Sequence, residues 1–340
     1  MDFELNDDQV ALRDELRRFL ADRMTSEARR AVIDMPGAVD RALWRELGGM
    51  GIFALTQPES EGGVGLGLAD ATIVYEELGR AAVPGPLLGT FFAAGLRDAG
   101  DEVAELAARA AAGEAVVGLV PAGDPVFVEH LAGLDALLVV ADDGVTLVDP
   151  PTSSRPVDRP LDPLTPVDLV DVLPPGRGVG GPDIAGGMRN AGALLAAALQ
   201  VGLAEAAVAL GTAYATDRTQ FGRVIGSFQA VKHLLADAQV QVEVARAAVQ
   251  AAGVTIDEFL RAEQAEAGTG DAAGVHRISE PARIVASRAA DRATRACIQV
   301  HGGIGFTWEL DAHLFLKRAL VLDVGIGTPE AAADRLAAAL

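Results

Sequence analysis

One stretch of the sequence carries residue types suited to binding a charged ligand. It begins RTQFGRVIGSFQ at Arg218. The guanidinium of Arg218 can pair with a phosphate through two parallel hydrogen bonds, and Gly222 after Phe221 would let the backbone approach a ligand closely. We therefore expect either a site for a planar ligand that bears a phosphate, or an ordinary amphipathic helix with a solvated arginine.

The hydrophobic pattern of the same stretch predicts that it lies on a helix. Apolar residues recur at steps of three and four, the spacing of one helical face: Phe221, Ile225, Phe228, Val231 and Leu234 or Leu235. Arg218 and Gln229 fall near the start of this stripe or beside it. The rest of the chain must then position this helix and whatever it binds.

Residues 1–112 are predicted to form a helical domain. Asn6 or Asp7 can cap a first helix, and further helices are expected over 42–50, 70–81 and 87–111, with a glycine-rich loop over 58–67: these assignments follow from periodicity, caps and turn residues. Glu76 and Glu77 are candidates for acid–base chemistry. A solvated helix face is the preferred interpretation of both, because glutamates are mostly exposed.

Residues 113–182 are predicted to form a small β domain. Short β-branched runs over 115–120, 136–140 and 145–148 are bounded by Pro, Gly and Asp, as strands are. Asp142-Asp143-Gly144 predicts a hairpin turn. The segment 149–182 is rich in Pro and Asp and leaves little room for long strands.

Residues 183–340 are predicted to form a helical bundle. Helices are expected over 189–216, 229–253, 255–268, 280–300 and 310–322, with a final helix that has Pro329 in its first turn. The predicted fold class is therefore mainly α with a small β domain. The five histidines are scattered, and no Cys/His spacing predicts a metal site.

Composition excludes several classes of partner. The formal net charge of −20 argues against nucleic acid, and any site for an anionic ligand needs a local basic patch. No uninterrupted apolar run has the length of a membrane span. The acidic start and the single cysteine, Cys297, predict a protein of the reducing cytoplasm.

Three blocks of the sequence resemble the acyl-CoA dehydrogenase family. The stretch from Arg218 matches the family's R-x-x-F-G…F-Q signature, and CIQVHGGIGF over 297–306 is similar to its Q-x-x-G-G segment. LWRELGGMGIFAL, PESEGGVGLGLAD and EELGRA resemble its helical first domain. The resemblance implies that family's fold: an N-terminal helical domain, a reduced β domain and a C-terminal four-helix bundle.

The resemblance also implies FAD as the cofactor, shared across a dimer. In that arrangement one subunit contacts the pyrophosphate and adenosine of its neighbour's FAD through a fixed set of residues, which here are Arg218, Phe221, Gln229, Gln299, Gly302 and Gly303. The wall that faces a subunit's own flavin ring is reduced, because 119–124 (LVPAGD) is a remnant of the family's segment. The later Trp-containing segment has no counterpart, since no Trp lies between Trp44 and Trp308.

The family's catalytic carboxylate has no counterpart in this sequence. Ile326 occupies the usual position of the Glu that removes the α-proton, and Gly192 occupies the alternative position on the first bundle helix. Asp323 and Glu330 are further candidates because they are near in sequence, but a shift of three or four residues from Ile326 directs their side chains elsewhere. No catalytic residue is therefore assigned.

These matches lead to one preferred hypothesis and two alternatives. The preferred one is a non-catalytic subunit of an α2β2 acyl-CoA dehydrogenase, whose homologous partner supplies the Glu and holds most of the acyl-CoA. By analogy with heteromers of the family, the acyl group would be a steroid side chain. The alternatives are a self-sufficient homomeric dehydrogenase or oxidase with an unrecognised base, and a flavin-free assembly protein.

Overall fold

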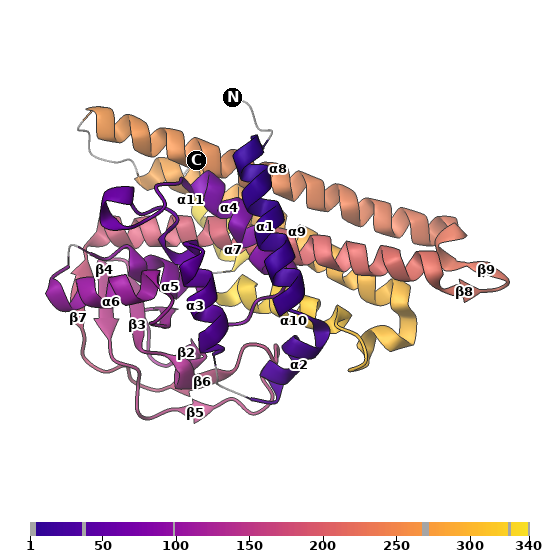
Figure 1. The fold of residues 1–340 in the computed structure, drawn as a ribbon, viewed down its shortest axis with the longest axis horizontal. Coiled ribbons are helices and arrows are strands. Elements are labelled where there is room, and N and C mark those ends of the chain that lie inside the picture. The colour runs from indigo at the N-terminus through magenta and orange to yellow at the C-terminus, as the bar shows by residue number, and fades with distance from the viewer. Residues whose placement is uncertain (1–4, 36–38, 98, 267–271, 326–327, 339–340) are drawn as a thin grey trace.

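The N-terminal part of the chain is a layer of helices. The computed structural model describes residues 5–35, 39–97, 99–266, 272–325 and 328–338 (Figure 1). The first six helices are α1 Asp7–Arg23, α2 Ser26–Ile33, α3 Arg41–Gly49, α4 Leu68–Arg80, α5 Leu87–Ala94 and α6 Asp101–Ala111. Asn6 caps α1 in a reciprocal pair of hydrogen bonds with Gln9, as predicted. The single helix expected over 87–111 is interrupted between α5 and α6, where Gly100 adopts a φ of 103°.

Two small sheets follow these helices. The first has strand order β1-β3-β4-β7 and the second β2-β6-β5. Their strands are β1 Val117–Pro121, β2 Val126–Glu129, β3 Ala136–Ala141, β4 Gly144–Val148, β5 Arg155–Pro156, β6 Val167–Val170 and β7 Arg177–Gly180. The three predicted strands correspond to β1, β3 and β4, and the predicted turn joins β3 to β4. The strands after 149 have two to four residues, in keeping with their Pro-rich sequence.

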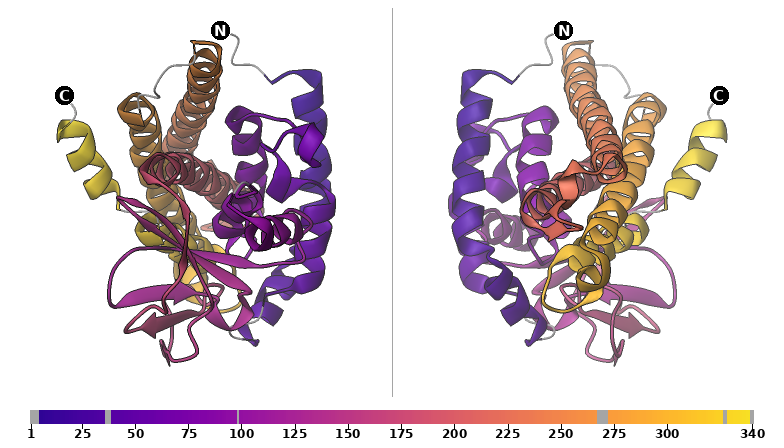
Figure 2. Two further views of the ribbon diagram at one scale, coloured as in Figure 1. Left: turned by 90° about the vertical axis from the view of Figure 1, so that its left-hand side faces the viewer. Right: turned by 90° about the vertical axis from the view of Figure 1, so that its right-hand side faces the viewer.

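Long helices complete the fold. They are α7 Pro182–Asp217, α8 Gln229–Glu266, α9 Ala272–His301, α10 Ala312–Gly325 and α11 Pro329–Ala338. Figure 2 shows α1 on one outer side of the bundle and the C-terminal helices on the other. Among the described helices, only α7 has the length and composition to cross a membrane, but 78% of its most apolar window is buried within the protein. It is the central core helix.

Glycine allows α4 and α7 to cross with their backbones in contact. A Cβ atom on Gly202 of α7 would lie 1.9 Å from the carbonyl oxygen of Glu76, and one on Gly79 of α4 would lie 2.1 Å from that of Leu199. Neither position therefore has room for a side chain, and the crossing depends on both glycines. Gly253 has a similar role: a Cβ there would lie 2.9 Å from Cα of Ala69. Two helices were predicted on either side of Gly253, but α8 runs unbroken through it.

The prediction that Glu76 and Glu77 form a solvated face was wrong. Glu77 is 2% exposed and accepts hydrogen bonds from Arg17 Nε at 2.9 Å and Nη2 at 2.5 Å. Glu76 is 8% exposed and accepts one from Arg246 Nε at 2.8 Å, while Nη2 of Arg246 donates to Glu205 at 2.7 Å. These arginines come from α1 and α8, so the two glutamates bind α4 to both neighbours. Burial raises the pKa of Glu76 to about 7, against the opposing effect of Arg246.

Candidate functional site

The stretch that begins at Arg218 is a hairpin, not the start of a helix. β8 Thr219–Gln220 pairs with β9 Arg223–Val224, followed by the short 3-10 helix η4 Ile225–Ser227, and α8 begins only at Gln229. Phe221 and Gly222 occupy the two turn positions with φ values of 52° and 78°. Positive φ at both positions is the geometry of a tight two-residue hairpin turn and is incompatible with a helix. Phe221 is consequently 92% exposed and not on a helical face.

The second predicted block lies beside this hairpin. Gln299 is exposed near the end of α9, and Gly302 and Gly303 open the 3-10 helix η5 Gly302–Phe306. The ring of Tyr214, near the end of α7, stacks on His301 with centroids 4.2 Å apart and so joins the two segments. The structure therefore brings all six predicted cofactor residues to one end of the bundle, with every one exposed: Arg218, Phe221, Gln229, Gln299, Gly302 and Gly303.

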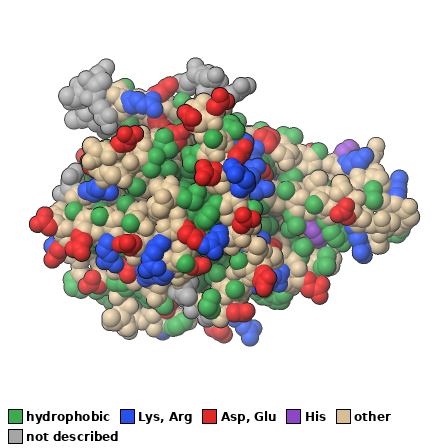
Figure 3. Space-filling view, in the orientation of Figure 1, with side chains coloured by type: hydrophobic (Ala, Val, Ile, Leu, Met, Phe, Trp, Pro, Cys, Tyr) green, Lys and Arg blue, Asp and Glu red, His purple; other side chains and the backbone are tan. Residues whose placement is uncertain are grey.

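This end of the bundle differs in character from the rest of the surface. The sequence from Arg218 to Ala236 contains Arg223 and Lys232 but no Asp or Glu, although the protein carries a net charge of −20. Figure 3 shows Lys and Arg side chains at the end that holds β8 and β9. Among the described residues Arg218 has no ion-pair partner, so its guanidinium is available. A Cβ on Gly302 or Gly303 would meet no described atom within 4 Å, which leaves the backbone open to a ligand.

Exposed aromatic side chains accompany these donors. Phe221 is 92% exposed in the hairpin turn, and Phe306 is 74% exposed at the end of η5. Arginine, amides, open glycines and aromatic rings are together chemically suited to phosphate groups and a planar ring.

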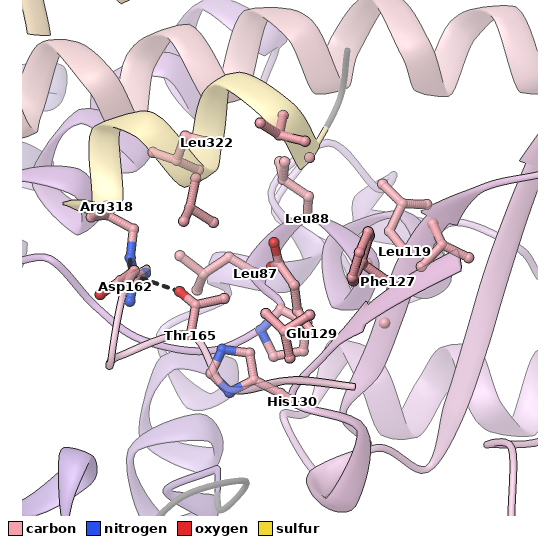
Figure 4. Close-up of a pocket in the computed structure, with 18 of the residues that line it drawn as sticks. Leu87, Leu88, Leu119, Phe127, Glu129, His130, Asp162, Thr165, Arg318 and Leu322 are labelled. Atoms are coloured by element: carbon pink, nitrogen blue, oxygen red, sulfur yellow. Dashed lines mark hydrogen bonds and ion pairs between the residues drawn. The ribbon is translucent and has the colours of Figure 1, made fainter. Parts of the chain in front are cut away.

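A separate cavity of 510 Å³ lies between the first helical layer, the strands and the bundle. Its walls come from the turn between α4 and α5, the end of β1, β2, the middle of α7 and the end of α10 (Figure 4). Leu87, Leu88, Leu119 and Phe127 supply much of the apolar lining. The 119–124 remnant contributes all its residues except Asp124. None of the six cofactor candidates lines this cavity.

Five polar residues line the same cavity, and sequence reasoning assigned none of them to a site: Glu129, His130, Asp162, Thr165 and Arg318. Asp162 is fully buried and accepts hydrogen bonds from Arg318 Nε and from Thr165 Oγ1, the latter at 2.7 Å. Arg318 also donates from Nη1 to the carbonyl of Val83 at 3.1 Å. Glu129 and His130 follow directly on the alternating Val126–Val128 segment of β2. A polar pair at the end of an alternating strand was the available signal.

Burial shifts the pKa values of Glu129 and His130 in opposite directions. Desolvation raises the pKa of Glu129, although Arg318 lowers it. Desolvation and Arg318 together lower the pKa of His130 to about 3, so its imidazole is neutral. Oε1 of Glu129 reaches the C-terminal end of α10, since a Cβ on Gly325 would lie 3.8 Å away. Glu129 thus brings a carboxyl group next to the residue that precedes Ile326.

The positions considered for a catalytic base do not supply one to this cavity. Ile326 lies outside the described residues, and Gly192 is buried within α7. Asp323 does not line the cavity. Its carboxylate accepts hydrogen bonds from Gln200 Nε2 at 2.6 Å and Arg283 Nη1 at 3.3 Å. Glu330 is exposed in the first turn of α11. Among the described lining residues, the carboxyl groups are those of Glu129 and Asp162.

Sequence comparison assigns the family. Residues 6–104 match the acyl-CoA dehydrogenase N-terminal domain, and residues 180–340 match the C-terminal domain of the same family. Acyl-CoA dehydrogenase IpdE2 from Mycolicibacterium smegmatis is 36% identical over 338 residues, which cover 98% of this chain and 99% of that protein. The chain belongs to the acyl-CoA dehydrogenase family. The fold class predicted from the sequence is thereby confirmed.

Solved structures of acyl-CoA dehydrogenases share the whole fold. The Tcur3481–Tcur3483 steroid acyl-CoA dehydrogenase, as a G363A variant, has a TM-score of 0.81 at 26% identity and covers 98% of this chain and 97% of its own. The ChsE4–ChsE5 complex from Mycobacterium tuberculosis has a TM-score of 0.82 at 24% identity, with 99% and 98% covered. The second likeness shows the fold alone.

Proposed function

We propose that this chain is a non-catalytic subunit of a heteromeric, FAD-dependent acyl-CoA dehydrogenase of the cytoplasm. Its partner is a homologous subunit, in an α2β2 assembly, which supplies the catalytic Glu and holds most of the acyl-CoA. Bound FAD supplies the hydride acceptor for α,β-desaturation of the thioester. The solved relatives include a named two-component steroid acyl-CoA dehydrogenase, which favours a bulky, steroid-derived acyl group as substrate.

One observation carries this proposal. The six cofactor residues gather on an exposed, basic end of the bundle and contribute nothing to the chain's own cavity. They are therefore positioned to contact a group held by another subunit. Arg218 would pair with the pyrophosphate, Gln229 and Gln299 would donate hydrogen bonds, and the backbone at Gly302 and Gly303 would approach the cofactor closely.

Flavin content tests the proposal. The chain is expressed alone and together with the homologous subunit, and flavin absorbance is measured after purification. We expect a yellow protein only from co-expression. A chain that is yellow and active alone would favour the homomeric alternative, and a complex that is never yellow would favour a flavin-free assembly protein.

Arg218 provides the matching substitution. A charge-assisted hydrogen bond contributes about 1.5–3 kcal/mol, so Arg218→Ala should weaken FAD retention by the complex about ten- to a hundred-fold. Arg218→Lys should recover only part of this, because an ammonium group cannot form two parallel bonds. Arg155 is exposed and, among the described residues, pairs with Asp171 on the β domain, so Arg155→Ala is the control. FAD retention equal to wild type in Arg218→Ala would remove the residue from the site.

The self-sufficient homomeric enzyme is the second candidate, because the cavity contains a carboxyl group after all. In that case Glu129 would take the α-proton, assisted by the desolvation that raises its pKa. Turnover by the purified single chain that is abolished in Glu129→Gln would favour this alternative. Inactivity of the chain alone would count against it.

A further inference from the structure

The short helix α2 binds the start of α10 and the segment before it through polar side chains (Figure 1). Asp311 is 6% exposed and accepts hydrogen bonds from three residues of α2. Ser26 Oγ donates to Oδ1 at 2.9 Å, Arg29 Nη2 to Oδ2 at 2.8 Å and Arg30 Nη2 to Oδ1 at 3.0 Å. The other terminal nitrogen of Arg30, Nη1, donates to the backbone carbonyl of Trp308. The guanidinium of Arg30 therefore bridges two points of the distant segment.

α2 depends on these polar contacts for its position. None of its eight residues is buried, so hydrophobic burial contributes little to its attachment. Its first turn is capped locally, because the side chain of Thr25 accepts a hydrogen bond from the backbone nitrogen of Ala28 at 3.1 Å. Hydrogen bonds between guanidinium and carboxylate groups are among the strongest that a protein forms. The arrangement is therefore suited to fix a position on the surface, and it adds no side chain to the core.

The segment 302–310 between α9 and α10 has few contacts that fix its course. It begins with the short 3-10 helix η5, whose hydrogen bonds are poorer than those of an α-helix, and one of the five residues of η5 is buried, Gly305. The backbone nitrogens of Thr307 and Leu310 donate within the segment itself. In the part of the chain that the structure describes, Arg30 is the residue outside α9 and α10 that donates a hydrogen bond to this segment.

We propose that α2 positions this segment, with Arg30 as the positioning residue and Asp311 as the carboxylate that holds Arg30 in place. Because the segment is short, a shift at Trp308 changes the direction of the exposed backbone at Gly302 and Gly303. That backbone is the part assigned above to the neighbouring subunit's cofactor, so α2 also supports cofactor binding. This last step rests on the subunit role proposed above, whereas the positioning by α2 does not.

Hydrogen exchange followed by mass spectrometry tests the positioning in the full-length chain alone. Arg30→Ala removes the bond to Trp308 and leaves Asp311 paired with Arg29. The hydrogen-bonded amides of 302–310 should then exchange about ten- to a hundredfold faster, the factor expected for one hydrogen bond to a charged group. Asp311→Asn should act in the same direction, because a neutral amide holds Arg30 less firmly. Asp311→Glu keeps the charge and should restore part of the protection.

Two controls separate positioning from a general loss of stability. Glu27→Gln changes an exposed carboxyl group of α2 that does not contact the segment, so exchange should remain as in wild type. Asp135→Asn removes a partly buried carboxylate elsewhere, which accepts hydrogen bonds from Arg41 Nη1 at 2.5 Å and from the backbone nitrogen of Val116 at 2.7 Å. This variant should lower the urea midpoint and leave exchange over 302–310 unchanged.

FAD retention by the co-purified complex tests the cofactor step with the same variants. Arg30→Ala should weaken retention about two- to tenfold, because a segment that is no longer held must be ordered when the cofactor binds. Faster exchange with wild-type retention would overturn the cofactor step.

Exchange over 302–310 decides the positioning itself. Wild-type exchange in Arg30→Ala would overturn the inference, and so would equally fast exchange in Asp135→Asn, since protection would then follow global stability. A wild-type complex without FAD would refute the proposed function, and the exchange rates would still decide whether α2 positions the segment.

Discussion

The crossing of α4 and α7 gives a sharp prediction for Gly202→Ala. The new Cβ would lie 1.9 Å from the carbonyl oxygen of Glu76 and 2.5 Å from the backbone nitrogen of Arg80. Ordinary contact begins at 3.4 Å, so the helices must separate by about 1.5 Å. Both obstructing atoms belong to the backbone, and no side-chain rotation can relieve the overlap.

The magnitude follows from two opposing effects. Overpacking a close-packed contact costs about 1–3 kcal/mol and more where only backbone can move, whereas Ala is about 1 kcal/mol more favourable than Gly within a helix. We expect Gly202→Ala to lower the free energy of unfolding by about 2 kcal/mol or more. Because Gly79, Leu199 and Leu203 line the cavity at this crossing, the substitution should also change the shape of the cavity.

Gly187→Ala is the matched control on the same helix. Its Cβ would meet nothing within 4 Å, so only the gain in helix propensity remains, and the variant should be about 0.5–1 kcal/mol more stable than wild type. Urea unfolding followed by circular dichroism measures both variants. If Gly202→Ala proved as stable as Gly187→Ala, the reasoning from backbone contact at this crossing would be wrong.

Two further predictions concern carboxyl groups. Ile326→Glu, which restores a carboxylate at the family's usual position, should not make the purified single chain active, because the sequence predicts a reduced wall for its own flavin ring. Dye-coupled turnover measures this, and robust activity would contradict the subunit role. Glu76 has a folded pKa of about 7 against an ordinary 4.5, so between these values the folded state retains a proton that the unfolded state has lost. Ionisation of Glu76 should therefore lower the free energy of unfolding by up to about 3 kcal/mol as the pH rises from 4.5 to 7. Urea unfolding of wild type and Glu76→Gln measures this, and the difference between their midpoints should be smallest at low pH.

Local sequence determined which elements form. Hydrophobic periodicity and caps predicted α1, α4 and the long helices, and β-branched runs between turn residues predicted β1, β3 and β4. The assignments of helices and strands depend on contacts between residues close in sequence. The six residues that the fold brings to one end of the bundle were instead predicted from the resemblance to the acyl-CoA dehydrogenase family. The helix predicted through Phe221 does not form, because Phe221 and Gly222 adopt positive φ in a hairpin turn despite the helical spacing of the apolar residues.

Tertiary structure alone decided the environment of the charged residues. Glu76 and Glu77 lie on a helix that α1 and α8 cover, so their burial depends on partners at distant positions. Local sequence predicts that a helix ends at Gly253. In the fold α8 continues through this residue, and the missing side chain lets Ala69 of α4 pack closely against it. The polar cluster of the cavity joins Asp162 to Arg318, which are 156 residues apart. No local pattern encodes such a pair, because only the packing of distant elements removes both charges from water and places them together.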